Sequence, residues 1–578
     1  MAGPTAPKDP EKARPFFYIL KDKDIFGERQ KDGTGIQFIY ESDGRLINSA
    51  QITGNVTDKE ELRLLETVEG FGRLVHSIGV SVETDRPEET AEFVFQMYGK
   101  KDLYGGGTNL TTSLKCDGME HRIYLSDYRW TEDDHVPGQI KILFAAPERM
   151  GKVSVRLFLN DGYEAPPEEE DLVIDMHSEE YCGMISRSLL QLGNPYRIRK
   201  AIEKSKAGKE VTLAYIGGSI TQGAGAIPIH TECYAYKSFQ LFQNRFSTQN
   251  NVRFIKAGVG GTPSELGMIR FDRDVLREGE RPDIVVIEFA VNDEGDETKG
   301  VCYESLVRKV LKLPWKPAVV LLFSVFANDW NLQERLRPVG DLYDLPMVSI
   351  RDAVTPQFSL KCGEGRILSK NQFFYDIFHP NNTGHTIMAD CLQYLFERCD
   401  AAEPARVGTF VEGMTEEQIL SEKLSGPAVI GADFERIFLL DKKNRYVGAK
   451  IRAGGFASTD MELQSVEMDG NLTQTPEFPY NWMYDGSRPQ MPGFEMEITC
   501  KSLFLIFKDS GEMDVGKADV FVNDVYCMTA DPHKNNWLHC NAVLLFWETE
   551  SRSHKVRITV TEEDRNKKFT ILGFGYTI

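Results

Sequence analysis

The stretch "VTLAYIGGSITQG", residues 211–223, decides how the middle of this chain folds. Its first half is a largely apolar run that stops at two glycines before Ser219. A run without polar alternation is typical of a strand buried on both faces of a parallel sheet. Ser219 therefore follows a predicted strand directly, at the edge where ligands bind in open α/β sheets. From this stretch alone, Ser219 is either a nucleophile or a turn residue.

The glycine spacing around Ser219 excludes several known motifs. The dinucleotide fingerprint G-x-G-x-x-G is not matched, and a phosphate-binding loop would need a Gly-Lys-Ser/Thr ending that is absent here. The stretch also differs from the G-x-S-x-G turn of α/β-hydrolases. The phosphate interpretations therefore fail, and the turn and nucleophile interpretations remain.

Strand-like and helix-length segments alternate through the middle of the chain. After residue 223, strand-like runs occur at residues 251–261, 282–293, 316–326 and 345–350. Amphipathic segments predict helices over Tyr234–Phe246, Ser264–Arg277, Tyr303–Lys312 and Gly384–Arg398. This alternation predicts a three-layer α/β/α domain with a parallel sheet.

Both flanking parts of the chain read as β structure. Short alternating runs fill the first third, including residues 35–54, and the last third includes runs at 494–509, 542–549 and 554–562. Such spacing predicts β-sandwiches of jelly-roll-like type. The predicted division is a disordered lead-in (1–15), an N-terminal β-sandwich (16–175), the α/β/α domain (176–400) and a C-terminal β-sandwich (401–578) that is a candidate for carbohydrate binding.

Composition limits the partners and the compartment. At 578 residues the chain is too long for a single core. The net charge of −20 opposes binding to nucleic acid or to anionic membranes, so neither partner is expected. The polar, proline-rich N-terminus does not resemble a signal peptide, and the ten cysteines form no C-x-x-C pair. We therefore expect a cytoplasmic protein with free thiols, and the sequence leaves homo-oligomerisation open.

Two later strand ends carry groups that can stabilise an oxyanion. In "KAGVGGTPSELG", residues 256–267, glycines leave backbone N–H groups uncovered, although a glycine-rich turn explains them equally well. The run "VVIEFAVND" ends on Asn292 and Asp293. The Asn292 amide is a candidate donor, whereas Asp293 is better explained as a helix N-cap.

The segment "YDIFHPNNTGHTIMAD", residues 375–390, contains Asp376 and His379 three positions apart. A carboxylate that binds one imidazole nitrogen leaves the other nitrogen able to take a serine proton. The alternatives are a surface pair beside a helix start and half of a metal site. Ligand spacing for a metal is lacking nearby, so we expect no metal. A serine nucleophile with a histidine base needs no organic cofactor, so none is expected either. His385 falls inside the predicted helix and is interpreted as a packing residue.

The four motifs together, in the order Ser, Gly, Asn and Asp-x-x-His, resemble the SGNH (GDSL-like) hydrolases over residues 211–399. The resemblance implies that Ser219 is the nucleophile, His379 the general base and Asp376 its orienting carboxylate. It implies an oxyanion hole built from the backbone N–H of Ser219, the backbone N–H of Gly261 and the Asn292 amide, with Gly260 as an alternative to Gly261. The family's Gly-Asp-Ser is Gly-Gly-Ser here, and "GGSIT" and "EFAVND" are most similar to its carbohydrate esterases.

The resemblance also suggests a substrate. Two sandwich companions are typical of glycan enzymes, and Trp330, Trp482 and Trp537 lie in polar loops that suit sugar binding, although packing explains each tryptophan as well. The expectation is a serine esterase that removes O-acetyl groups from hemicellulose-derived oligosaccharides of mannan or xylan. An O-acyltransferase, an esterase or lipase acting on non-carbohydrate esters, and a silent glycan-binding protein remain the alternatives.

Overall fold

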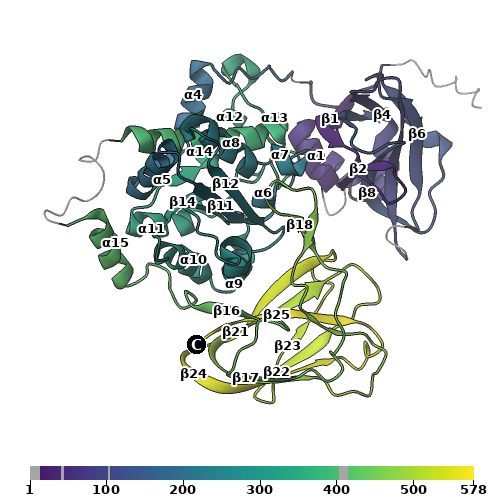
Figure 1. Cartoon of the computed structure of the whole chain (residues 1–578). Coiled ribbons are helices and arrows are strands. Elements are labelled where there is room, and N and C mark those ends of the chain that lie inside the picture. Colours follow the sequence, from purple (N-terminus) through teal and green to yellow (C-terminus); the bar gives the residue numbers. More distant parts are fainter. Residues whose placement is uncertain (1–12, 41–44, 102–104, 169, 403–413) are drawn as a thin grey trace, which may run out of the picture. The chain divides into compact units, whose positions relative to one another are not determined.

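The structure is a computed structural model that describes residues 13–40, 45–101, 105–168, 170–402 and 414–578 (Figure 1). Most of the lead-in predicted at residues 1–15 lies outside this part of the chain. The contacts divide the chain into two compact units. The N-terminal unit contains the residues up to Asp175 together with Pro356–Gly384, and the C-terminal unit contains Met176–Thr355 together with His385–Ile578.

Two antiparallel sheets form the N-terminal unit in the part that the structure describes. One has the order β1 (Phe16–Phe26), β9 (Met150–Leu159), β4 (Val75–Thr84) and β7 (His121–Tyr124). The other has the order β2 (Glu28–Arg29), β3 (Gly35–Tyr40), β8 (Asp134–Phe144), β5 (Thr90–Gly99) and β6 (Asn109–Lys115). Apolar side chains from both sheets, including Ile78, Phe93 and Val155, share one core. This is the predicted β-rich N-terminal domain.

Three helices interrupt this domain, and the sequence did not predict them. They are α1 (Arg45–Thr53), α2 (Lys59–Leu64) and α3 (Val68–Leu74). The expectation of β structure throughout residues 35–54 is therefore wrong for α1. The buried residues Leu46, Ala50 and Thr53 recur at helical spacing, which buries one face of a helix and not one face of a strand.

The middle domain is built on a mainly parallel sheet. Within the described residues, six strands pair in the order β10 (Leu189–Gln191), β15 (Met347–Ser349), β14 (Ala318–Phe323), β13 (Ile284–Glu288), β11 (Val211–Gly217) and β12 (Val252–Gly258). All pairs are parallel except the edge pair of β10 and β15. The predicted parallel sheet is confirmed, with one antiparallel edge strand added.

Helices cover both faces of this sheet (Figure 1). On one face α5 (Tyr196–Lys206) packs beside α8 (Tyr234–Phe246), and on the other α9 (Ser264–Phe271) packs beside α10 (Val301–Leu311). Strands β11, β13 and β14 are buried along their whole length, as expected for a sheet covered on both sides. In the described part of the chain, no helix is long and apolar enough to cross a membrane.

The register of the sheet aligns the ends of its three central strands. Gly217, the last residue of β11, pairs with Gly258 at the end of β12 and with Glu288 at the end of β13. Because the three strands are parallel, the loops that follow them leave the same edge of the sheet. The predicted Ser, Gly and Asn motifs therefore begin at adjacent positions.

The C-terminal module, residues 437–578, is a strongly bent β structure. In the described residues, its main sheet contains β16 (Ile437–Leu440), β17 (Ala449–Arg452), β20 (Trp482–Tyr484), β21 (Phe494–Asp509), β22 (Ala518–Val522), β23 (Val525–Ala530), β24 (His539–Val560) and β25 (Phe569–Thr577). The strands predicted at residues 542–549 and 554–562 are one long strand, β24, whose register with β21 shifts beside Cys500. Such a shift bends a strand without ending it, so the sequence showed two runs.

The C-terminal module and the middle domain share one hydrophobic core. Phe504 and Leu572 of the module pack in the same buried cluster as Ile269 of α9 and Val307 of α10. A separate cluster fills the interior of the module itself. The shared core explains why both parts belong to the same compact unit.

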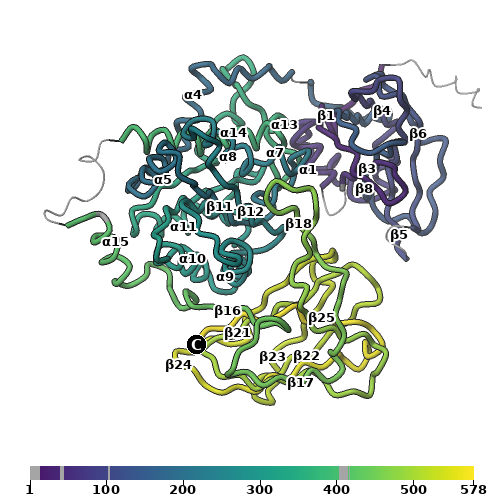
Figure 2. The backbone as a smooth tube through the Cα atoms, in the orientation of Figure 1, coloured from purple at the N-terminus to yellow at the C-terminus, as the bar shows by residue number. Residues whose placement is uncertain are grey.

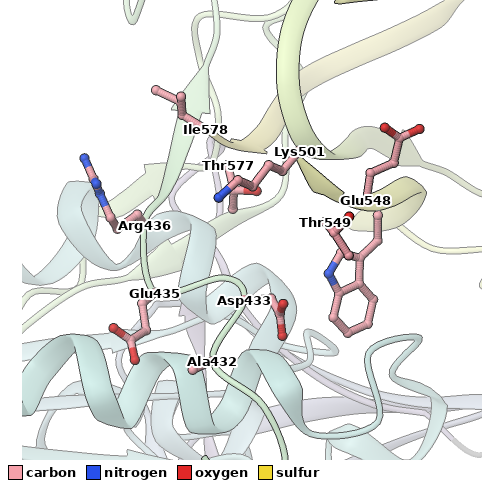
Figure 3. Close-up of a pocket in the computed structure, with 10 residues that line it drawn as sticks. Ala432, Asp433, Glu435, Arg436, Lys501, Glu548, Thr549, Thr577 and Ile578 are labelled. Atoms are coloured by element: carbon pink, nitrogen blue, oxygen red, sulfur yellow. The ribbon is translucent and has the colours of Figure 1, made fainter. Parts of the chain in front are cut away.

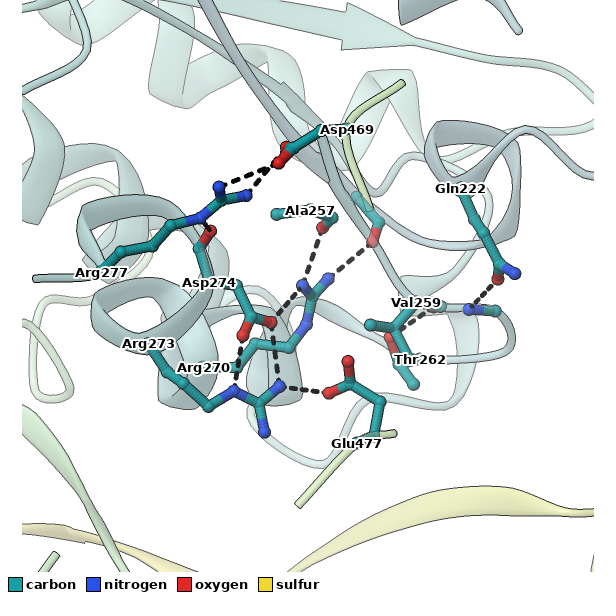
Figure 4. A network of polar contacts seen from close by, with 12 residues as sticks. Gln222, Ala257, Val259, Thr262, Arg270, Arg273, Asp274, Arg277, Asp469 and Glu477 are labelled. Carbon is teal, nitrogen blue, oxygen red and sulfur yellow. Dashed lines mark hydrogen bonds and ion pairs between the residues drawn. The ribbon is translucent and has the colours of Figure 1, made fainter. Parts of the chain in front are cut away.

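A buried arginine holds the ends of β11 and β12 (Figure 4). Arg270 of α9 is fully buried, and its guanidinium donates to the carbonyls of Ala257 at 2.7 Å and Gly217 at 2.8 Å. It also pairs with Asp274 at 3.0 Å. Burial raises the pKa of Asp274, but the neighbouring Arg273 and Arg270 guanidinium groups outweigh it, so the pKa is lowered and the carboxyl stays ionised. Arg270 thus satisfies two strand-end carbonyls at once.

We predict that Arg270→Ala lowers the free energy of unfolding by about 3–5 kcal/mol, because it leaves buried carbonyls and a buried carboxylate without their partner. Arg245→Ala, which removes an exposed pair with Glu397, is the matched control and should cost about 0–1 kcal/mol. Thermal unfolding of both variants measures the difference. Equal shifts in Tm would show that the buried hydrogen bonds of Arg270 do not stabilise the fold.

Candidate active site

Ser219 stands at the edge of the sheet, as predicted. It follows Gly218 and opens the short helix α6 (Ser219–Gln222), directly after β11. Gly218 leaves no room for a side chain, because an added Cβ would lie 2.3 Å from Oδ1 of Asn292. The glycine at the position of the family's aspartate therefore lets the Asn292 amide lie against the serine loop. The first and third motifs thus come together in space.

The second motif lies beside the serine. A Cβ added to Gly260 would be 3.8 Å from the Cβ of Ser219. Gly260 is buried, and its N–H donates to Oε1 of Gln222 at 2.9 Å. Gly261 is exposed and has a φ of 72°, a conformation that favours glycine. The two glycines therefore differ: the N–H of Gly260 is used within the loop, and Gly261 forms the exposed turn.

Asn292 and Asp293 have separate roles at the end of β13. Asn292 is half-buried, and its Oδ1 is buried with no hydrogen-bond partner among the described residues. Asp293 is fully buried, and its Oδ1 accepts from the backbone N–H of Ser264 at 2.7 Å. Burial raises the pKa of Asp293 to about 8. Asp293 thus caps the start of α9, and not the short 3-10 helix η3 (Asp293–Gly295) that it begins.

Asp376 and His379 form a hydrogen-bonded pair within the N-terminal unit. Nδ1 of His379 lies 3.0 Å from both carboxylate oxygens of Asp376, and Oδ1 also accepts from the backbone N–H groups of Phe378 and His379 at 2.8 and 2.9 Å. Burial raises the pKa of Asp376, but the His379 imidazole and Arg45 outweigh it, so the pKa is lowered to about 2. An ionised carboxylate on Nδ1 favours the tautomer that carries its proton there, and Nε2 is then able to accept a proton.

A buried lysine of β1 holds the segment before this pair. Lys23 is 2% exposed and donates from Nζ to the carbonyl of Phe374 and, at 3.4 Å, to that of Asn371. The pairing of β1 shifts register just before Lys23, where Asp22 has a φ of 52°. Such an irregularity re-aims the next side chain. The N-terminal unit therefore supplies a fixed support for the Asp376–His379 segment.

The three tryptophans predicted to bind substrate have different environments. Trp482 is 5% exposed and packs against Phe494 and Phe574 in the core of the C-terminal module, so its prediction as a surface contact is wrong. Trp330 is half-buried and stacks on Phe326 with ring centroids 5.7 Å apart. Trp537 is 45% exposed, and a Cβ added to Gly261 would lie 2.8 Å from its ring. Of the three, Trp537 borders the second motif.

The remaining side chains that are able to act as bases, nucleophiles or metal ligands show no arrangement for catalysis among the described residues. His385 is fully buried; its Nδ1 accepts from the backbone N–H of Tyr234 at 3.1 Å, and its Nε2 lies 3.1 Å from the carbonyl of Ala224, in agreement with the predicted packing role. All ten cysteines are unpaired thiols, and burial raises the pKa of Cys391 to about 12, which makes such a thiol a poor nucleophile. Among the described residues, no group of three or more His, Cys, Asp or Glu side chains could hold a metal ion.

Sequence reasoning missed the residues that hold the loops. Arg270 had a local signal, an arginine that follows the apolar run Leu266–Ile269 and precedes Asp274 by four residues. Lys23 and Gln222 had none, because their partners are backbone atoms of distant segments. Two further side chains, Gln464 and His539, contact the carbonyls of Gly260 and Gly261 from more than 200 positions away in the chain.

One pocket of the C-terminal unit has no connection to these motifs. It is lined by Ala432, Asp433, Glu435, Arg436, Lys501, Trp547, Glu548, Thr549, Thr577 and Ile578 (Figure 3). Its lining includes no predicted site residue. Charged groups of both signs line it, and we assign it no role in the chemistry.

Comparison with known proteins agrees with the motifs. Residues 215–387 match the family described as GDSL-like Lipase/Acylhydrolase, a segment that contains Ser219, Gly261, Asn292, Asp376 and His379. A comparison with curated proteins found no match. Residues 215–387 therefore form a GDSL-like lipase/acylhydrolase domain, the domain of a carboxylic ester hydrolase.

Two solved structures share the fold over most of their length. One is the crystal structure of a two-domain esterase (CEX) active on acetylated mannans, with 24% identity, a TM-score of 0.55, and coverage of 68% of this chain and 98% of that chain. The other is the same esterase co-crystallised with mannopentaose, with 24% identity, a TM-score of 0.53 and the same coverage. At this identity the likeness establishes the fold.

We predict that Asp376→Asn lowers stability in a pH-dependent way. The folded pKa of about 2 lies below the ordinary value of 3.8, so the ionised carboxylate adds about 2 kcal/mol of stability above pH 4. This contribution is lost as the pH falls towards 2. The difference in Tm between wild type and variant should therefore shrink as the pH falls from about 4 towards 2. A difference that grows over this range would contradict the assignment.

Proposed function

We propose that this protein is a serine esterase that removes O-acetyl groups from oligosaccharides, with Ser219 as nucleophile and His379 as general base. The observation that carries the proposal is the register of Gly217 with Gly258 and Glu288, from which three motif-bearing loops leave one sheet edge. A serine hydroxyl, an exposed glycine turn and an amide side chain follow these positions. That set is what acyl transfer through a covalent intermediate requires.

The reaction proceeds in two steps. His379 takes the hydroxyl proton as the Ser219 oxygen attacks the acetyl carbonyl, and the sugar hydroxyl then leaves with that proton. Water, activated by the same imidazole, releases acetate from the acetyl-serine. The ionised Asp376 carboxylate orients the imidazole and stabilises the imidazolium that forms in each step.

Gly261 is a better candidate than Gly260 for the backbone donor to the oxyanion. The N–H of Gly260 already donates to Gln222 inside a buried part of the loop. Gly261 is exposed, and its φ of 72° places it in the turn. We therefore assign the oxyanion to the backbone N–H groups of Ser219 and Gly261 and to the Asn292 amide. A donor of this kind contributes on the order of 10²–10³ in rate.

Trp537 supports a sugar substrate. Its exposed ring lies against Gly261 and so borders the position assigned to the acetyl group. An aromatic face offers a flat apolar surface to the C–H face of a sugar ring. The structural neighbours are described as an esterase active on acetylated mannans, which favours acetylated mannan oligosaccharides as the first substrate to test.

We predict that Ser219→Ala and His379→Ala each abolish acetate release from 4-nitrophenyl acetate, because one removes the nucleophile and the other its base. Ser553→Ala and His135→Ala change the same residue types at exposed positions and serve as matched controls with unchanged rates. Initial rates and thermal unfolding are measured for all four. Full activity in either active-site variant refutes the assignment.

We predict that incubation with acetylated manno-oligosaccharides removes acetyl units, as read by mass spectrometry. Acetylated xylo- and chito-oligosaccharides are the comparison substrates. Unacetylated manno-oligosaccharide added with an acetyl donor should not gain mass. A gain of acetyl units would favour an O-acyltransferase, and activity on simple esters without any on oligosaccharides would favour a non-carbohydrate substrate.

A further inference from the structure

Two side chains of the C-terminal module bind the loop that contains Gly260 and Gly261. Nε2 of Gln464 donates to the carbonyl of Gly260 at 3.0 Å, and Nε2 of His539 donates to the carbonyl of Gly261 at 2.9 Å. Gln464 is 8% exposed and His539 is 5% exposed. Consecutive carbonyls of the glycine turn are therefore fixed by buried donors from outside the middle domain.

Both donors are themselves held in place. Oε1 of Gln464 accepts from the backbone N–H of Cys540 at 3.0 Å. Nδ1 of His539 accepts from the Asn535 amide at 3.3 Å, which requires the ring proton on Nε2. Burial lowers the pKa of His539, so the neutral ring with this tautomer is favoured at neutral pH. Each side chain thus presents its N–H to the loop in a fixed orientation.

The planarity of the peptide bond connects these contacts to catalysis. The carbonyl of Gly260 and the N–H of Gly261 belong to one trans peptide unit and point in opposite directions. A hydrogen bond that fixes the carbonyl of Gly260 therefore also fixes the direction of the Gly261 N–H. Glycine has more backbone freedom than any other residue, so two consecutive glycines depend on outside contacts to hold one orientation.

A second contact holds the other side of Gly260. Its N–H donates to Gln222, whose Nε2 donates to Glu467 of β18 (Ser465–Glu467) at 3.2 Å. Strand β18 pairs with β19 (Gln474–Pro476) in a ribbon that reaches the middle domain (Figure 2). Gln222 and its bond to the glycine loop are visible at the edge of the polar network in Figure 4. Three residues of the module thus restrain one glycine loop, two directly and one through Gln222.

We propose that Gln464 and His539 are positioning residues of the esterase, which aim the Gly261 N–H at the oxyanion. This inference rests on the proposed function, because it assumes that Gly261 stabilises the oxyanion. It assigns the C-terminal module a part in the chemical step in addition to any sugar binding. Loss of the contacts should therefore impair hydrolysis of the smallest ester, which is too small to reach a separate sugar-binding surface.

The test compares Gln464→Glu, His539→Ala and His539→Gln on 4-nitrophenyl acetate. Glutamate keeps the acceptor for Cys540 but loses the donor to Gly260, and alanine at 539 loses the donor to Gly261. Both variants should lower kcat about tenfold or more with KM changed less than about twofold, since only transition-state binding is weakened. His539→Gln can donate from a similar position and should recover most of the rate.

The matched control is Asp469→Asn, which weakens an ion pair between the module and Arg277 of the middle domain but keeps an acceptor for the backbone N–H of Lys256 and leaves the contacts of Gly260 and Gly261 unchanged. Asp469 pairs with Arg277 at 2.8 Å, as shown in Figure 4. This variant should keep the wild-type kcat, and all variants should retain a cooperative thermal transition. An equal loss in Asp469→Asn would mean that docking alone matters, and that result would overturn the proposal.

Ser219→Ala, measured in parallel, distinguishes a failure of the positioning role from a failure of the esterase assignment. If Ser219→Ala is inactive while Gln464→Glu and His539→Ala keep kcat within about twofold of wild type, the positioning role is wrong and the esterase assignment stands. If Ser219→Ala remains active, the proposed function itself fails.

Discussion

The parallel register at Gly217 is the constraint on which the candidate site depends. Because Gly217 faces Gly258 on one side and Glu288 on the other, three loops leave the sheet at the same level. None of the three motifs is specific alone, since each resembles an ordinary turn. Their common exit from the sheet brings Asn292 against Gly218 and Gly260 close to Ser219.

Groups that are distant in the chain hold these loops in place. The Arg270 guanidinium donates to backbone carbonyls at the ends of β11 and β12. The C-terminal module binds the carbonyls of the glycine turn through Gln464 and His539. Hydrogen bonds within the Asp376–His379 segment hold it in one conformation. Lys23 of the N-terminal unit binds the backbone carbonyl of Phe374, just before this segment. Each compact unit thus stabilises the candidate catalytic motif that it contains.

The sequence predicted the parts of the structure that depend on local pattern. Strands β11 to β15 and helix α8 were predicted because their apolar runs are continuous or periodic. Helix α1 was missed because its buried positions lie in a polar segment, and β24 was divided in two because a register shift interrupts its pattern. Trp482 was misplaced because a polar loop sequence does not reveal that a ring turns into the core. Lys23, Gln222, Gln464 and His539 had no local signal in the sequence, since their partners are backbone atoms of other segments.

The central claim is that Ser219 forms the covalent intermediate, and labelling tests it directly. The protein is inactivated with a diethylphosphoryl ester of 4-nitrophenol, digested, and mapped by tandem mass spectrometry. We expect one diethylphosphoryl group on Ser219, with labelling that follows the loss of activity in equal proportion. Complete inactivation with Ser219 unlabelled, or a label on a different residue that tracks the activity, would contradict it.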